Sequence, residues 1–113
     1  MASSAGKVGE VRVNAERLTS YIRAICEKEG SEPGEAKIVA ENLVLANLYG
    51  HDSHGVGMIP RYIENARSGN CKRNWHAKIV VDNGAVITVD GGKGYGQVVA
   101  GEAMDFGIER AKQ

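Results

Sequence analysis

The stretch ANLYGHDSHGVGMIPRY at residues 46–62 joins two apolar helical patterns through a short polar turn bounded by glycines. Residues 35–49 are apolar around much of a helical circumference, which predicts the most buried helix of the chain, ended by Gly50. Beyond the turn, apolar residues recur from 58 to 66 and predict a third helix or turn that stops at Gly69. The chain is therefore expected to begin as a set of packed helices.

The residues before this stretch predict one further helix and a tail. Asn14 is a suitable N-cap for a helix over 15–29, and Gly30 supplies its end. Residues 1–13 are expected to form a flexible N-terminal tail, which leaves 14–76 as a helical N-terminal region. The apolar face of the first helix would be formed by Leu18, Ile22, Ile25 and Cys26.

The last third of the chain changes from a helical pattern to a strand pattern. Two β-branched runs at 78–82 and 85–90 flank Asn83-Gly84, which is a strong hairpin signal. A glycine-rich loop then leads to a last helix that starts near Gln97. The fold class is therefore α/β, with N-terminal helices, a β-hairpin and a following helix. Because that helix has no end signal and a lone hairpin is marginally stable, we expect the front of a longer protein.

Composition argues against several classes of protein. The 113 residues carry 14 Lys and Arg against 14 Asp and Glu, so no excess positive charge favours a nucleic-acid partner. Aromatic residues make up 5%, which leaves few stacking platforms for single strands. No apolar run predicts a membrane span or a secretory signal, and two cysteines are too few for a disulfide framework. The expectation is a cytoplasmic protein without nucleic-acid or membrane partners.

The glycine-rich loop at 91–96 has the strand–loop–helix arrangement of a phosphate-binding motif, in which glycines let the backbone approach phosphate oxygens. Its register does not match a dinucleotide fingerprint, because Val99 stands where Gly or Ala is required. The Lys-Ser/Thr pair of a phosphate loop is also missing. We therefore interpret these glycines as a sharp turn that packs a strand against the following helix.

The turn GHDSHG at residues 50–55 collects four side chains that can move protons or bind oxygen atoms. A Ser-His-Asp triad is disfavoured, because triad members converge from separate segments and sequence neighbours do not readily point at one another. A metal site could use His51 and His54, but its further candidate ligands are only Asp52 and the distant His76. We assign no metal site.

Two interpretations of the turn remain. The Ser53 hydroxyl and the His54 imidazole could hydrogen-bond the oxygens of a small carboxylate or carbonyl substrate. Alternatively, Asp52 or Ser53 caps a backbone turn and the histidines merely lie on the surface. The residues of the turn by themselves leave both interpretations open.

Residues 46–62 as a whole resemble the N-terminal signature of the malate/L-lactate (sulfolactate-like) dehydrogenase family, in its hydroxycarboxylate dehydrogenase branch. GHDSHG is the specific part, and ITVDG at 87–91 with the following helix extends the resemblance from about residue 14 to the C-terminus. The resemblance implies oxidation of 2-hydroxy acids with NAD or NADP by a cytoplasmic homodimer. It also implies a cofactor fold without the Rossmann fingerprint, in which 77–113 begin the α/β cofactor and substrate domain.

The resemblance also implies roles for residues of the turn. His54 would lie against the nicotinamide end of the cofactor and against the substrate, and Ser53 would hydrogen-bond the substrate. Some branches carry Arg at the position of Met58, which could grip a carboxylate, whereas Met58 cannot. The family's catalytic acid/base histidine would lie beyond residue 113, so no catalytic residue is assigned.

The resulting prediction is the N-terminal part of an oxidoreductase that transfers a hydride between NAD(P) and a small 2-hydroxy or 2-oxo carboxylic acid. This segment alone is expected to be inactive. The alternative is a non-enzymatic binding or dimerisation domain in which the His-Asp-Ser-His turn is only a structural cap. A metal-dependent hydrolase is a third possibility.

Overall fold

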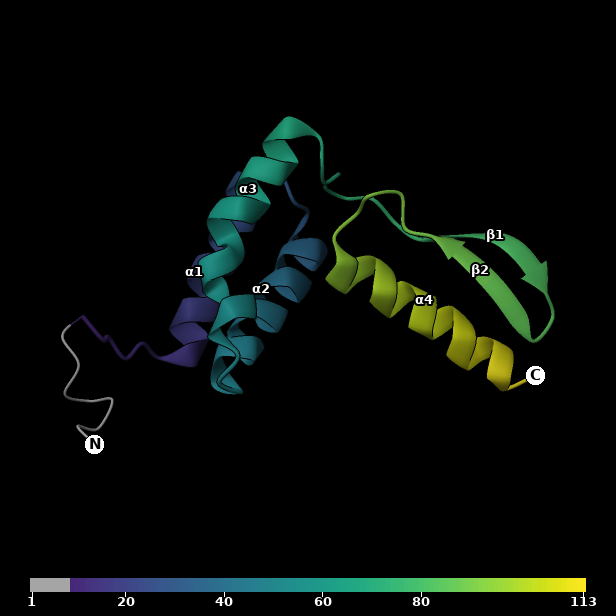
Figure 1. Ribbon diagram of the computed structural model, residues 1–113, viewed down its shortest axis with the longest axis horizontal. Coiled ribbons are helices and arrows are strands. Elements are labelled where there is room, and N and C mark those ends of the chain that lie inside the picture. Colours follow the sequence, from purple (N-terminus) through teal and green to yellow (C-terminus); the bar gives the residue numbers. More distant parts are fainter. Residues whose placement is uncertain (1–8) are drawn as a thin grey trace.

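The computed structural model describes residues 9–113, and Figure 1 shows helices on one side and a hairpin with a last helix on the other. The predicted order of helices, hairpin and helix is confirmed. Of the tail predicted for residues 1–13, residues 1–8 lie outside the described residues, and residues 9–13 form no helix or strand. The elements are α1 (Ala15–Lys28), α2 (Pro33–Leu48), the short 3-10 helices η2 (Asp52–His54) and η3 (Val56–Met58), α3 (Ile59–Ser68), β1 (Lys78–Asn83), β2 (Val86–Asp90) and α4 (Gly96–Ala111).

Helix α2 is the centre of the core, as its apolar circumference predicts. Val39 and Leu43 on this helix are 0% and 1% exposed. Helix α1 packs along α2 with Ile22 and Cys26, two of the residues predicted for its apolar face. The end of α2 leaves the core, and Leu48 is 65% exposed. Further buried members of the core are Ala36, Ala40, Ile59, Tyr95 and Val98.

Polar contacts define where α1 and α2 begin. The Asn14 side chain accepts a hydrogen bond from the backbone N–H of Arg17 at 3.0 Å, so the predicted N-cap is confirmed. Before α2, the buried Ser31 hydroxyl donates to the buried Glu35 carboxylate at 2.7 Å. Glu35 lies in the first turn of α2, where a negative charge is favourable.

The junction at residues 69–77 connects the helices to the hairpin, and hydrogen bonds of Asn74 attach it to the helical part. Its backbone N–H donates to Glu35 at 2.9 Å, while its side-chain amide donates to the Gly30 carbonyl and accepts from the Glu32 N–H. Asn74 has a φ of 61°, a left-handed conformation that Asn tolerates better than most residues. One residue therefore ties the junction to the loop between α1 and α2.

The hairpin turn differs by one residue from the sequence prediction. Strand β1 pairs with β2 in antiparallel fashion and Asn83 lies opposite Val86, so the two loop residues are Gly84 and Ala85 rather than Asn83-Gly84. Gly84 has a φ of 73°, and its N–H donates to the Asp82 carboxylate at 3.2 Å. Glycine at the first loop position suits a tight hairpin turn, which explains why pairing continues through Asn83.

Helix α4 runs beside the hairpin in Figure 1 and covers one of its faces. Ile87 and Val89 of β2 are half-buried, whereas β1 is exposed along its whole length. Arg110 of α4 makes a bidentate ion pair with Asp82, with N–O distances of 2.6 and 2.8 Å. Such a covering layer is what a two-stranded hairpin needs for stability. Within residues 9–113, no helix has the length and apolar character required to cross a bilayer.

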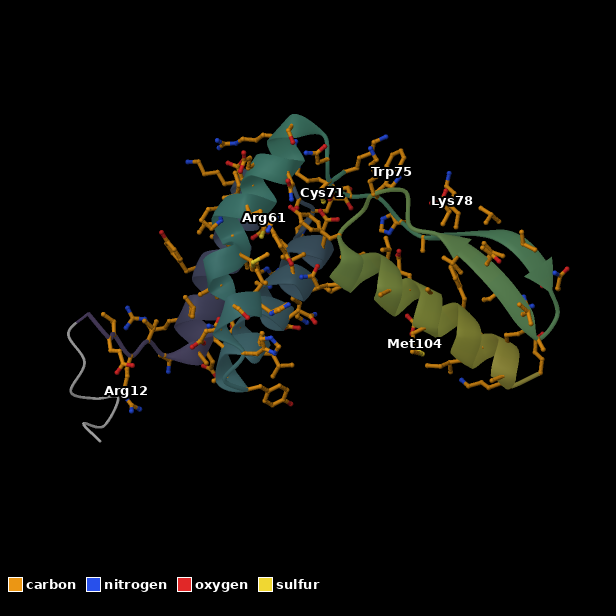
Figure 2. All side chains as sticks on the ribbon, in the orientation of Figure 1. Arg12, Arg61, Cys71, Trp75, Lys78 and Met104 are labelled. Atoms are coloured by element: carbon orange, nitrogen blue, oxygen red, sulfur yellow. The ribbon has the colours of Figure 1, made fainter. Side chains whose placement is uncertain are left out.

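The glycine-rich loop packs closely against its neighbours, as interpreted from the sequence. A Cβ added at Gly91 would meet the Val99 side chain of α4 at 3.0 Å. At Gly92, where φ is 56°, an added Cβ would overlap the indole of Trp75, a residue labelled at the junction in Figure 2. The Lys72 ammonium lies 4.7 Å from the centre of the same ring, within cation–π range.

Removing the side chain of Leu43 should strongly destabilise the protein. Leu43→Ala is expected to lower the free energy of unfolding by about 2–5 kcal/mol, because a buried leucine leaves a cavity. Leu48→Ala on the same helix is the matched control and should change it by less than about 0.5 kcal/mol. Urea unfolding followed by circular dichroism measures both, and equal losses would contradict the described burial of α2.

A second prediction concerns His76, whose ring bonds to Glu102 of α4 at 2.7 Å while Glu102 also accepts the Ala77 N–H. The hydrogen bond to Glu102 raises the pKa of His76 above its ordinary value of 6.5. The pair therefore contributes its full stabilisation below pH 6.5 only where Glu102 is still ionised. This stabilisation is lost as pH rises through the folded-state pKa of His76, and again as pH falls through the lowered pKa of the Glu102 carboxyl.

Glu102→Gln should bring the pKa of His76 back toward 6.5, as measured by an NMR titration of the imidazole signals. Glu109→Gln is the control, because Glu109 lies on the same helix but pairs with Lys112. An unchanged His76 titration in Glu102→Gln would contradict the described contact.

Candidate functional site

The polar turn begins where α2 ends, without a spacer between them. The N–H of His51 donates to the Ala46 carbonyl at 2.8 Å, and the N–H of Gly50 donates to the Asn47 carbonyl at 2.9 Å. These two bonds form a Schellman motif, which requires a left-handed residue after the helix, and Gly50 has a φ of 79°. The end of a buried helix therefore sets the starting position and direction of the turn.

Two single-turn 3-10 helices, η2 and η3, form the body of the turn. The His54 N–H donates to the His51 carbonyl at 3.0 Å, and the Met58 N–H donates to the Gly55 carbonyl at 3.0 Å. Ser53 and His54 are exposed on η2, as a group that handles a ligand must be before the ligand binds. Met58 is half-buried and packs against the helical core.

The side chains of Ser53 and His54 contact each other, contrary to the expectation for sequence neighbours. The Ser53 Oγ lies 3.0 Å from His54 Nδ1. His51 and His54 are three residues apart, the spacing at which side chains of a 3-10 turn eclipse. The rings of His51 and His54 meet edge to face, with centroids 4.2 Å apart. The carboxylate of Asp52 bonds instead to the Asn47 amide at 2.7 Å. The three residue types of a triad therefore do not form a relay.

The Ser53–His54 contact influences which ring nitrogen of His54 faces outward as a donor. If the hydroxyl donates to Nδ1, the neutral imidazole carries its proton on Nε2. Nε2 then donates a hydrogen bond, and the second lone pair of the Ser53 oxygen still accepts one. An exposed pair of this kind offers a donor and an acceptor side by side, which suits a ligand that carries an oxygen acceptor next to a hydroxyl or amide donor.

Asn47 is a residue of this region that the sequence pattern does not single out. Its amide donates to Asp52 and accepts the Val56 N–H at 2.8 Å, so it contacts both short helices. The signal in the sequence is only a polar amide in the last turn of a helix that is apolar around much of its circumference. A hollow of about 560 Å³ beside Asn47 and Asp52 is also lined by Arg12, labelled on the segment before α1 in Figure 2.

The remaining expectations for the turn concern capping and metal ligands. Neither η2 nor η3 has a side-chain cap, so the structure does not show Asp52 or Ser53 in the capping role. His76 lies at the junction and bonds to Glu102, away from the turn. In the part of the chain from residue 9 onward, no three His, Cys, Asp or Glu side chains gather as a metal site.

Comparison with known sequences identifies relatives across almost the whole chain. Residues 13–113 match the profile of the malate/L-lactate dehydrogenase family. Hydroxycarboxylate dehydrogenase B of Escherichia coli is 52% identical over 102 residues, which is 90% of this chain and 28% of that protein. Malate dehydrogenase of Pyrococcus abyssi is 37% identical over 103 residues, or 91% of this chain and 28% of that protein. The chain thus spans little more than a quarter of these relatives' length.

Solved structures show the same arrangement of elements. Malate dehydrogenase from Pyrococcus horikoshii superposes with a TM-score of 0.88 at 36% identity, covering 94% of this chain and 30% of that one. Sulfolactate dehydrogenase from Methanocaldococcus jannaschii superposes with a TM-score of 0.83 at 37% identity, covering 89% and 29%. The helices, the turn, the hairpin and α4 therefore reproduce part of a larger known fold.

The Ser53–His54 contact is testable by NMR, because the chain has only three histidines. Ser53→Ala removes the partner of Nδ1, so the Nδ1 and Nε2 nitrogen shifts of His54 should move as its tautomers redistribute. The signals of His76 should stay in place. Ser20→Ala, an exposed serine on α1, is the control, and unchanged His54 shifts in Ser53→Ala would contradict the contact.

Proposed function

The chain belongs to the malate/L-lactate dehydrogenase family, and on that basis we propose that it is the N-terminal part of a hydride-transferring oxidoreductase. The proposed enzyme interconverts a small 2-hydroxy carboxylic acid and its 2-oxo form with NAD or NADP. We also propose that it acts as a cytoplasmic homodimer, as the family resemblance implies. The observation that carries the proposal is the exposed Ser53–His54 pair on a turn held against a buried helix, inside the matched region.

The side chains of the turn fit a cofactor and substrate of this kind. We assign His54 to the nicotinamide end of the cofactor and to the substrate, and Ser53 to a substrate oxygen. The imidazole N–H can donate to a carboxamide or carboxylate oxygen, and the Ser53 oxygen can accept from the hydroxyl of a 2-hydroxy acid. When bound, the nicotinamide group supplies the hydride chemistry, while these two side chains bind and orient.

We propose that a residue other than Ser53 and His54 removes the proton of the substrate hydroxyl. Oxidation of a hydroxy acid needs a base that takes this proton as the hydride leaves carbon. His54 is held by Ser53 at Nδ1 and its ring contacts that of His51 edge to face, which suits a binding group of fixed orientation. We propose that the acid/base histidine lies after residue 113 and that these 113 residues alone do not turn over substrate.

A chimera tests the proposal. This chain would replace the matched segment of the Escherichia coli hydroxycarboxylate dehydrogenase B, to which it is 52% identical. The chimera should oxidise NADH in the presence of 2-oxo acids, and the 113-residue chain alone should not. His54→Ala in the chimera should lower kcat/KM at least about tenfold, since a ligand hydrogen bond to a positioned donor is lost.

His76→Ala is the matched control in the same chimera, because His76 lies at the junction and should leave kcat/KM within about twofold. Equal activity of the chimera with and without His54 would contradict the assigned role. A folded but inactive chimera would favour the alternative of a binding or dimerisation domain. Turnover by the 113-residue chain alone would refute the proposal that the site is completed elsewhere.

A further inference from the structure

We propose that Asn47 is a positioning residue, which holds Ser53 and His54 in the orientation from which they bind. The inference rests on the proposed function as far as binding is concerned. The placement of the turn itself can be tested without any activity. The inference rests in turn on the contacts of Asn47, on the close approach of Gly55, and on the exposed pair having no other polar side-chain contact within residues 9–113.

The side chain of Asn47 bonds to the first residue of each short helix. Its Nδ2 donates to the Asp52 carboxylate at 2.7 Å, where η2 begins. Its Oδ1 accepts from the Val56 N–H at 2.8 Å, where η3 begins. Ser53 and His54 lie between these two attachment points. One amide on the last turn of α2 therefore fixes the segment on both sides of the pair.

The backbone at Gly55 packs closely against the side-chain amide of Asn47. Gly55 is buried, and a Cβ added there would overlap the side-chain atoms of Asn47. Its φ of −94° is open to any residue, so close approach rather than backbone conformation requires glycine at this position. The amide of Asn47 is thus enclosed between η2 and η3, and moving it would displace the turn.

The exposed pair has no comparable attachment of its own. In the described part of the chain, the polar side-chain contact of Ser53 and His54 is with each other, and the His51 ring adds an edge-to-face contact. All three side chains are exposed. Their orientation relative to the core therefore depends on how the backbone of the turn is held, and Asn47 supplies the side-chain bonds that hold it.

The chemistry of the amide suggests a pair of substitutions that breaks and restores the contact. Asn47→Asp keeps the shape and the acceptor for the Val56 N–H, but it loses the donor and brings two carboxylates together. Adding Asp52→Asn returns a donor, because the new amide at position 52 donates to the new carboxylate at position 47. The double variant reverses the direction of one hydrogen bond and keeps both.

The first measurement is the NMR spectrum of the histidines in the 113-residue chain. Asn47→Asp should shift or broaden the ring signals of His54, and the double variant should return them toward the original positions. Asn42→Asp is the matched control. Asn42 lies on the same helix, and the substitution removes the hydrogen bond that its side-chain amide donates to the Ile38 carbonyl, away from the turn. His54 signals that stay unchanged in Asn47→Asp, or that the double variant does not restore, would overturn the inference.

The second measurement is kinetic and uses the chimera. Because Ser53 and His54 are assigned to binding, Asn47→Asp should raise the KM for NADH about tenfold and change kcat less than about twofold. The double variant should bring the raised KM most of the way back to its original value. A purely structural role would instead lower kcat and the amount of active protein together. If His54→Ala itself has no effect, the proposed function fails, and the NMR comparison still decides the role of Asn47.

Discussion

The packing of α2 is the constraint on which the rest of the molecule depends. Val39 and Leu43 lie fully buried at its centre, α1 packs along it, and the start of α4 reaches it through Val98. Burying one such side chain contributes about 1.5–3 kcal/mol, whereas one hydrogen bond contributes about 0.5–1.5 kcal/mol net. The apolar core therefore supplies most of the stability, and the polar bonds at the end of α2 supply direction to the turn.

The chain is extended rather than compact, because the hairpin and most of α4 lie away from the helical core. The radius of gyration is 17.0 Å, compared with about 13 Å for a compact domain of similar length. The helices form one half, and the hairpin with α4 forms the other, joined at residues 69–77. Polar attachments at Asn74 and His76 connect this junction to both sides. These hydrogen bonds, together with the burial of Tyr95 and Val98 in the helical core, set the relative placement of the two parts.

Sequence reasoning succeeds where the physics is local. Asn14 caps α1, Gly50 and Gly69 follow helices with positive φ, and the strands lie on both sides of Gly84 because each signal acts within a few residues. The hairpin is misplaced by one residue because the turn type depends on pairing between the strands. The sequence locates Ser53 and His54 through a recognisable motif, but not the contact between their side chains.

Long-range polar contacts are what the sequence does not predict. Asn47 reaches Val56, nine residues ahead, and Glu35 reaches Asn74 across 39 residues. No period or spacing relates such pairs, since they exist only once the helices are packed. Ile108 near the end of α4 is 46% exposed, while Val98 at the start of the same helix is buried in the core. Only the three-dimensional arrangement decides which end of an apolar helix meets a partner.

The placement of Trp75 gives the molecule a built-in optical reporter. It is the only tryptophan in the chain, and its indole lies close to both the Lys72 ammonium and the backbone of Gly92. Light emission from this ring therefore originates at the junction between the two halves, whereas far-ultraviolet dichroism originates mostly in the helices. Comparing the two signals during unfolding distinguishes a chain that melts as one unit from a chain whose hairpin half separates first.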